Sequence, residues 1–324
     1  MNHDMPELRV HVTPPWPFRL GGGSLNGLTR RRGAGLHRLL HRDGAPVHVA
    51  VIQPARDRVT FGARAASEPD AMWGIRRMRF ALGVDDDLRP FHDAFRDDPL
   101  IGRAVRELPH LRVRRTPVPW EALLAAVTEQ LIEFERAVEI QRRLIAALVP
   151  RDPATGLRDV PPPAAVAGLA PARLVQMDLA PARALSLRRA AAELAAGRAD
   201  LLSDDPMPAW RRLRAIPGIG QWTLEMLGLH GHGDLDRVPA GDLGFLKLVG
   251  RLQTGDPRAR VDVPAAYAFF APYAGWRGLA GSYLIVAHAR GWLPLSPAGA
   301  RPAGRVPVRP GTRSSAPARR SAAA

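Results

Sequence analysis

The stretch LRAIPGIGQWTLEMLGLHGHGDLDRVPAGDLG, residues 213–244, decides the fold that we expect for this chain. A short helix leads into residues 217–220, where two glycines flank one apolar residue, and a second helix begins at Gln221 or Trp222. Glycine lacks a Cβ atom, so such a hairpin can approach a surface more closely than other residues allow. The free N–H groups at the start of the second helix point out of the hairpin, together with the positive end of the helix dipole. This pattern predicts an anion site, and phosphate is the anion that repeats along a polymer in the cell.

The composition limits the classes of function. The 324 residues suggest two domains, and a hydrophobic content of 46% is enough for a sizeable core. No apolar run is long enough to span a membrane, and the first residues lack the features of a signal peptide. The absence of cysteine excludes disulfides, zinc fingers and iron–sulfur clusters. We therefore expect a cytoplasmic protein without a membrane partner.

The charge favours a polyanionic partner. The net charge is +15, and six arginines without any acid follow Leu295, which leaves about +9 on the body of the chain. A body this basic favours nucleic acid over an ordinary basic enzyme. Only one of the 46 basic residues is a lysine, Lys247. The last segment, residues 295–324, is rich in Ser, Pro, Ala and Arg, and this composition predicts a disordered tail.

The first hundred residues show mixed patterns. Three segments alternate in the manner of half-buried strands, namely 8–13, 46–52 and 58–62. Between the first two, the glycine-rich residues 20–27 and the arginine cluster 30–32 indicate a loop. Residues 72–82 and 88–95 have helical spacing. We expect an N-terminal α+β domain over residues 1–112.

A helical pattern begins near residue 116. Pro119 suits a first helical turn, and one apolar stripe then runs to about Leu148 through Leu124, Val127, Leu131, Phe134, Val138 and Ile145. Further helices are expected at 171–176, 181–197, around Trp210, and at 243–252, 263–271 and 277–290. We expect an all-α domain over residues 113–294.

The motif IPGIGQWT (216–223), followed by DRVPAGDLG (236–244), resembles the helix-hairpin-helix DNA glycosylases, and within them the 3-methyladenine DNA glycosylase II family. The resemblance extends more loosely over residues 8–293. It implies an α+β N-terminal domain followed by an all-α helix-hairpin-helix catalytic domain. It also implies a monomeric bacterial protein associated with the nucleoid that binds double-stranded DNA and releases alkylated purines in base excision repair.

The resemblance assigns the catalytic role to Asp242. An N-glycosidase must stabilise a deoxyribose that becomes cationic as the base leaves, and a fixed carboxylate supplies the opposite charge. The same group can orient or deprotonate the attacking water. Asp234 and Asp236 are nearby rivals, although Asp236 better suits a role in shaping the loop. The alternative for Asp242 is a cap for the helix that begins at Leu243.

Several residues match positions that hold DNA in the family. Gly218, Gly220 and Thr223 match the hairpin positions that bind a phosphate, with an ordinary helical turn as the alternative. The pair Gln130 and Leu131 matches the family's Q-L, whose leucine enters the space left by the flipped base. Periodicity alone would make that leucine a core residue. The family often holds Na or K on hairpin carbonyls, which match Arg214, Ile216 and Ile219 here. No other cofactor is expected.

The resemblance also outlines a base pocket. Trp222 falls where the bifunctional relatives keep the lysine that attacks the sugar, so we expect base release without strand cleavage. Trp276 and Arg277 match the W-R that leads the last helix, and there the tryptophan stacks on the extruded base. Core packing is the alternative for both tryptophans. Met226 replaces a tyrosine of the family, and Gly275 replaces a proline.

Three alternatives stay open. His230 and His232 invite a metal site, but their spacing fits no closed zinc set, and a solvated loop is the better interpretation. The substrate class could be deaminated or oxidised bases instead of alkylated ones. The chain could also be a non-catalytic module that binds DNA lesions.

Overall fold

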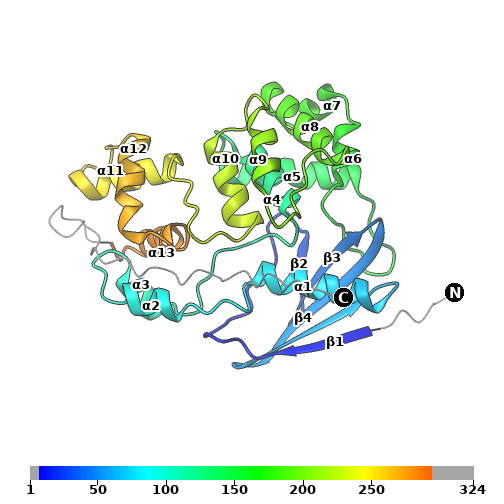
Figure 1. Cartoon of the computed structure of the whole chain (residues 1–324), viewed down its shortest axis with the longest axis horizontal. Coiled ribbons are helices and arrows are strands. Elements are labelled where there is room, and N and C mark those ends of the chain that lie inside the picture. Colours follow the sequence, from blue (N-terminus) through cyan, green and yellow to red (C-terminus); the bar gives the residue numbers. More distant parts are fainter. Residues whose placement is uncertain (1–6, 294–324) are drawn as a thin grey trace, which may run out of the picture.

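The computed structural model describes residues 7–293 (Figure 1). The expected tail at 295–324 lies outside the described residues. The described part divides into a sheet with one covering helix and two helical lobes, each with its own apolar core. Within that part, no helix is both long enough and apolar enough to cross a membrane.

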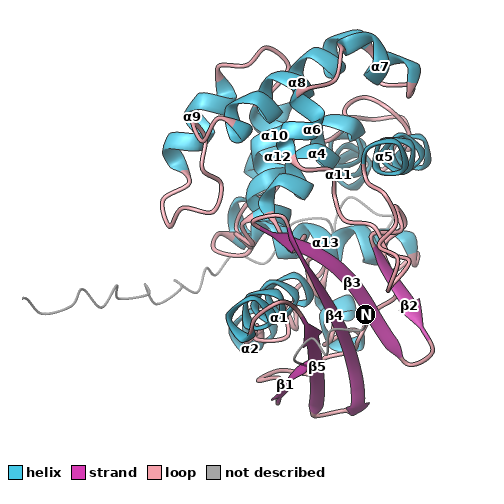
Figure 2. Ribbon diagram, turned by 90° about the vertical axis from the view of Figure 1, so that its right-hand side faces the viewer, coloured by secondary structure: helices cyan, strands magenta, loops and turns pink. Residues whose placement is uncertain are grey.

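The N-terminal sheet is antiparallel and five-stranded. Its strands are β1 (Glu7–Val12), β2 (Thr29–Arg32), β3 (Gly35–Arg42), β4 (Ala45–Ala55) and β5 (Arg58–Arg64), in the order β1-β5-β4-β3-β2. Helix α1 (Glu68–Leu82) covers one face across β4 and β5 (Figure 2). The helix begins at Ser67, whose hydroxyl accepts a hydrogen bond from the Asp70 N–H, and it ends at Gly83 in the left-handed conformation.

The expected loop over residues 30–32 is wrong. These residues form β2, which pairs with β3 in the register Arg30↔His37 and Arg32↔Gly35. Strand β3 itself was missed because its sequence, GLHRLLHR, does not alternate between apolar and polar residues. The alternation is interrupted at Arg38. Its side chain is fully buried, at a position where an alternating strand pattern would place an apolar residue.

The helical part begins beyond α1. Its elements are α2 (Arg89–Phe95), α3 (Gly102–Glu107), α4 (Pro119–Glu129), α5 (Phe134–Leu148), α6 (Pro163–Ala167), α7 (Pro171–Gln176), α8 (Pro181–Ala195), α9 (Met207–Arg214), α10 (Gln221–Met226), the π-helix η1 (Leu227–Gly231), α11 (Leu243–Thr254), α12 (Val263–Phe270), the 3-10 turn η2 (Ala271–Tyr273) and α13 (Arg277–Ala289). Helices α4–α10 share one apolar core. Helices α11–α13 share another, to the left in Figure 1.

Helices α2 and α3 pack with the C-terminal lobe. Their apolar residues share a core with α11–α13, and the Tyr283 hydroxyl on α13 donates to the Leu108 carbonyl (2.9 Å) at the end of α3. The Tyr273 hydroxyl donates to Asp98, which precedes α3. The second helical lobe is therefore built from two segments, 88–113 and 229–293, on opposite sides of the other lobe in sequence. The expected domain boundary at residue 112 would therefore separate α2 and α3 from α11–α13, although these helices share one core.

The single apolar stripe expected to run to Leu148 is also wrong. Helix α4 ends at Glu129, and α5 begins at Phe134. Between them, Leu131 has a φ of 53° and a side chain that is fully exposed. Phe134 is 48% exposed, so neither residue belongs to the core that helical spacing suggests.

Candidate active site and DNA-binding surface

Asp242 lies at the junction of the two helical lobes. It is the N-cap of α11, where its Oδ1 accepts a hydrogen bond from the Gly244 N–H at 2.8 Å. Its Oδ2 accepts a hydrogen bond from Trp222 Nε1, on α10 of the other lobe, at 3.2 Å. The capping role and a chemical role are compatible, because each carboxylate oxygen has one donor and the group stays half-exposed. Two donors on one carboxylate fix its orientation.

The hairpin presents its glycines to solvent. Gly218 and Gly220 are exposed, whereas Ile216 and Ile219 are buried in the core of the first lobe. Gly218 has a φ of 90°, and a Cβ atom there would collide with Ser186 Oγ, so this position requires glycine. A Cβ atom at Gly220 would meet nothing within 4 Å, so the fold itself leaves space in front of this residue. The hairpin thus has the exposed, close-approach backbone that its sequence predicts.

The turn after α4 is tied to this hairpin. The Gln130 side-chain amide donates to the Gly218 carbonyl (2.8 Å) and to Thr223 Oγ1 (2.9 Å). Arg183 on α8 donates to the Gln130 carbonyl at 2.6 Å. These contacts hold the next residue, Leu131, in its unfavourable left-handed conformation with its side chain in solvent. Backbone strain of this kind persists only where the surroundings enforce it, and it is frequent at functional sites.

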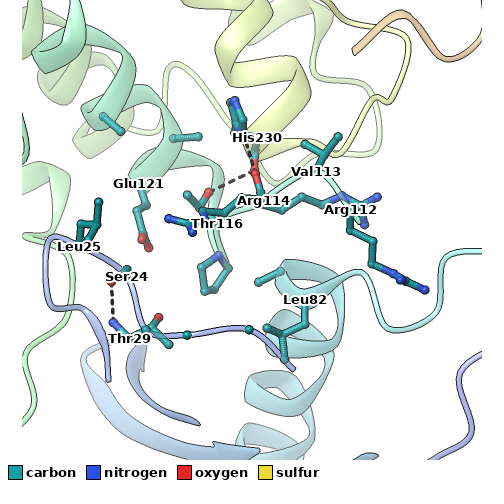
Figure 3. Close-up of a pocket in the computed structure, with 18 of the residues that line it drawn as sticks. Ser24, Leu25, Thr29, Leu82, Arg112, Val113, Arg114, Thr116, Glu121 and His230 are labelled. Atoms are coloured by element: carbon teal, nitrogen blue, oxygen red, sulfur yellow. Dashed lines mark hydrogen bonds between the residues drawn. The ribbon is translucent and has the colours of Figure 1, made fainter. Parts of the chain in front are cut away.

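A cavity of about 560 Å³ lies between the first helical lobe and the N-terminal domain. Figure 3 shows the residues that form its walls. The N-terminal domain contributes Ser24 and Leu25 from the loop before β2, Thr29 at the start of β2, and Leu82 from α1. The other walls are formed by Glu121 from α4, His230 from η1 and the connecting segment Arg112–Thr116. Met226, which the sequence assigns to the base pocket, lines the same cavity. Trp222, Asp242 and Trp276 are not among its lining residues.

Glu129 is a pocket residue that the sequence analysis missed. It lines the cavity at the end of α4. Its pKa is raised to about 7: burial is the main cause and the negative charge of Asp242 adds to it, whereas a hydrogen bond from Gln141 lowers it. The influence of Asp242 means that the two carboxyl groups are within electrostatic reach of each other. In the sequence, the only indication of a functional role for Glu129 is that it directly precedes Gln130. A glutamate at the solvated end of a helix would show the same pattern.

The structure buries Trp276, whereas the Arg277 side chain is partly exposed and paired. Trp276 is 3% exposed and packs in the second lobe, with its ring 5.9 Å from that of Phe91. Arg277 forms an ion pair with Asp236, which agrees with a loop-shaping role for that aspartate. These contacts are those of core packing and loop anchoring, and the predicted contacts of both residues with base or DNA are untested. The departure at Gly275 has a local cause: its φ of 86° is one that proline cannot adopt.

The expectation of a solvated loop at His230 and His232 is wrong. His230 lies within the π-helix η1, its Nδ1 lies 2.6 Å from the Arg114 carbonyl, and its own carbonyl accepts a hydrogen bond from the Thr116 N–H. His232 lies 3.3 Å from Trp210 Nε1. Burial lowers the pKa of both histidines. Among the described residues, no cluster of three or more His, Cys, Asp or Glu side chains is arranged to hold a metal ion.

Comparison with known sequences finds relatives among DNA repair proteins. No family model matches the chain. A Mycobacterium tuberculosis protein named probable bifunctional transcriptional activator/DNA repair enzyme AlkA is 29% identical over 242 residues. This match covers 73% of the chain but 47% of the relative, so the chain spans about half of that protein's length. The DNA-3-methyladenine glycosylase of Bacillus subtilis is 26% identical over 208 residues, 60% of the chain and 69% of that protein.

The fold matches a solved glycosylase structure. The 3-methyladenine DNA glycosylase of Archaeoglobus fulgidus superposes with a TM-score of 0.70 at 18% identity, over 87% of the chain and 98% of the solved structure. The sheet near the N-terminus and the helices that follow it are shared with such neighbours. Sequence and fold therefore both confirm the resemblance of the chain to the helix-hairpin-helix DNA glycosylases.

Proposed function

We propose that this protein is a DNA glycosylase that extrudes a damaged purine from duplex DNA and hydrolyses its N-glycosidic bond. The observation that carries this proposal is the double hydrogen bond on Asp242, from Trp222 Nε1 and from the Gly244 N–H. The bonds hold one carboxylate in a fixed orientation at the junction of two lobes, beside the exposed hairpin. A fixed negative charge stabilises the cationic sugar of the transition state without having to reorganise during the reaction.

In this proposal the reaction needs one water molecule. The bond between C1′ and the base breaks, and its electron pair leaves with the base. Asp242 stabilises the positive charge that remains on the sugar and orients the water that adds to C1′. Asp242 then accepts the proton released by that water. The products are a free base and an abasic site.

DNA would contact the surface formed by the hairpin and the turn after α4. The N–H groups at Gly218, Gly220 and Thr223 would bind a backbone phosphate, and the space in front of Gly220 supports such an approach. Leu131 would fill the gap left by the flipped base, which its exposure and strained backbone support. We keep the predicted Na or K site on the carbonyls of Arg214, Ile216 and Ile219 as part of this proposal. The Ile216 carbonyl already accepts a bond from the Ile219 N–H, so an ion would have to share that oxygen.

We propose alkylated purines as the substrate class and base release without strand cleavage as the outcome. The names of the Bacillus and Archaeoglobus relatives support the substrate class. An alkylated purine is cationic, so it leaves without strong acid catalysis. An indole at position 222, in place of a lysine, supports hydrolysis over a covalent amine mechanism.

The test is base release from methylated duplex DNA by the wild type and by Asp242→Asn. Asparagine caps helices as well as aspartate, so the variant should fold and keep its affinity for duplex DNA. It should lose base release by about 10³-fold or more, because it removes the charge that stabilises the transition state. Base release that survives this substitution would overturn the role of Asp242. Tight duplex binding without release by the wild type would favour another lesion class, to be examined with a panel of lesion oligonucleotides, and then a non-catalytic module.

A further inference from the structure

The end of helix α4 carries a carboxyl group that the proposed reaction does not use. Glu129 lines the cavity beside Met226, the residue that the sequence assigns to the base pocket. Its one described hydrogen bond is long, at 3.4 Å from Gln141 Nε2. Within residues 7–293, no arginine, lysine or histidine lies within ion-pair distance of it. Glu129 is therefore a half-buried carboxyl group without a cation to neutralise it.

Other charged groups of the cavity are engaged elsewhere. Glu121 pairs with the buried Arg38 (2.7 Å), and Arg115 pairs with Asp86 (2.7 Å). Arg112 donates to the carbonyls of Gly83 and Pro17, both at 2.7 Å. The remaining charged or titratable side chains that line the cavity are Arg19, His110, Arg114 and His230. The groups that set the pKa of Glu129 are its own burial, Gln141 and Asp242, so none of these cavity cations compensates its charge.

The neighbour of Glu129 is held in place. The Gln141 carbonyl oxygen accepts from Asn26 Nδ2 at 3.1 Å, on the loop of the N-terminal domain. Its amide nitrogen is shared between Thr128 Oγ1 (3.0 Å) and Glu129. The fixed amide limits where the Glu129 carboxyl group can turn. One carboxyl oxygen faces Gln141, and the other has no described partner in the protein.

The carboxyl groups of Asp242 and Glu129 differ in environment. Asp242 accepts hydrogen bonds from the Gly244 N–H at 2.8 Å and from Trp222 Nε1 at 3.2 Å. Glu129 has burial and the nearby negative charge, and its pKa of about 7 keeps a large fraction of it protonated at neutral pH. A carboxyl group that keeps its proton at neutral pH can serve as a proton donor. An acid with a pKa near the working pH is also the most effective proton donor.

We propose that Glu129 is a general acid for the leaving base, and that it extends the substrate range from cationic alkylpurines to uncharged purine lesions. The Glu129 proton passes to a ring nitrogen of the purine, N7 or N3, as the bond to C1′ breaks and its electron pair stays on the base. The base then leaves neutral instead of as an anion, and solvent returns a proton to Glu129. A cationic alkylpurine needs no such proton, and its charge would favour the ionised form of Glu129. This inference rests on the glycosylase function proposed above.

The experiment compares two single-lesion duplexes under single-turnover conditions from about pH 5.5 to 8.5. One carries 7-methylguanine, which is cationic, and the other carries hypoxanthine, which is uncharged. The wild type should release both, and its rate on hypoxanthine should fall as the pH rises through about 7. Glu129→Gln should slow hypoxanthine release by about 10²-fold or more at pH 6 and flatten its pH profile, because a general acid contributes about 10² to 10⁴ in rate. Release of 7-methylguanine should fall by a much smaller factor than release of hypoxanthine, because a cationic base leaves without a proton from the protein.

The matched control is Glu135→Gln, an exposed carboxyl group on the next helix that should behave as the wild type on both duplexes. Equal losses on both duplexes, or retained hypoxanthine release in Glu129→Gln, would overturn the acid role. So would a wild type that releases 7-methylguanine and leaves hypoxanthine in place. A wild type that releases neither base would instead contradict the glycosylase function on which the inference rests.

Discussion

The indole nitrogen of Trp222 lies 3.2 Å from Oδ2 of Asp242, and this hydrogen bond joins the two helical lobes. Trp222 belongs to α10 in the first lobe, and Asp242 begins α11 in the second. The contact therefore fixes the proposed catalytic carboxylate relative to the hairpin that would hold the DNA. The family resemblance matches position 222 to a lysine of bifunctional enzymes, and here the indole at that position donates to the proposed catalytic carboxylate.

Removing this hydrogen bond should slow base release. Trp222→Phe keeps an aromatic ring but loses the N–H, and a hydrogen bond to a charged group contributes about 1.5 kcal/mol, so we expect a roughly tenfold lower single-turnover rate. Trp73→Phe on α1 is the matched control and should leave the rate unchanged. An unchanged rate in Trp222→Phe would mean that the Gly244 N–H alone orients Asp242.

Truncating Leu131 should affect DNA chemistry without affecting stability. Because the side chain is fully exposed, Leu131→Ala should shift the melting temperature by no more than about 1 °C. Base release should fall by about tenfold, since the side chain would no longer offset the cost of base flipping. Leu202→Ala removes another exposed leucine and should change neither property. A lower melting temperature of Leu131→Ala with unchanged base release would show that Leu131 contributes to packing and not to base flipping.

The protein should form no covalent adduct with DNA through a lysine. The chain has one lysine, Lys247, which is exposed on α11, and position 222 is an indole. Borohydride treatment during the reaction should trap no cross-linked species, and strands should break only after hot alkali. A cross-link that disappears in Lys247→Arg would show lyase chemistry and contradict this expectation.

The buried ion pairs that Arg38 of β3 forms with Glu121 of α4 and with Asp159 of the loop before α6 should be important for stability. Arg38 is fully buried, and its Nη2 lies 2.7 Å from Glu121 and 2.9 Å from Asp159. Glu121→Gln leaves the guanidinium charge poorly compensated, so we expect a loss of about 3 kcal/mol in the free energy of unfolding measured with urea. Glu139→Gln breaks an exposed helical pair and should cost less than about 0.5 kcal/mol. Equal costs for the two substitutions would contradict this account.

The pKa of Glu129 predicts a pH-dependent effect on stability. Its pKa is about 7 in the folded protein and 4.5 as the ordinary value, so the folded state binds the proton more tightly. Below pH 4.5 the carboxyl is protonated in both states, and the cost to the folded state then grows until the pH passes about 7. Glu129→Gln removes this cost, so its stability relative to the wild type should increase by up to about 3 kcal/mol between pH 4.5 and pH 8. Identical pH dependence in both proteins would mean that Glu129 is better solvated than the structure indicates.

The sequence was sufficient where the determining interactions are local. Glycines at 218 and 220 define the hairpin, and an aspartate before an apolar run defines the cap of α11 at Asp242. Strands β1, β4 and β5 alternate because one face of the sheet is buried, and they were found within a few residues. Periodicity and capping patterns reflect interactions between residues a few positions apart. The hairpin, the cap of α11 and these three strands depend on such local interactions.

The tertiary structure decided what depends on distant partners. Arg38 is buried within a strand because Glu121 and Asp159, 83 and 121 positions away, compensate its charge. The break at Leu131 is held by Gln130, whose amide reaches the Gly218 carbonyl 88 positions away. Glu129 gains its raised pKa from burial and from Asp242, neither of which a helix end reveals in sequence. The sequence by itself therefore determined the hairpin and the aspartate that identify the family resemblance. Only the folded chain decided which residues surround them, because burial and charge depend on contacts between segments far apart in sequence.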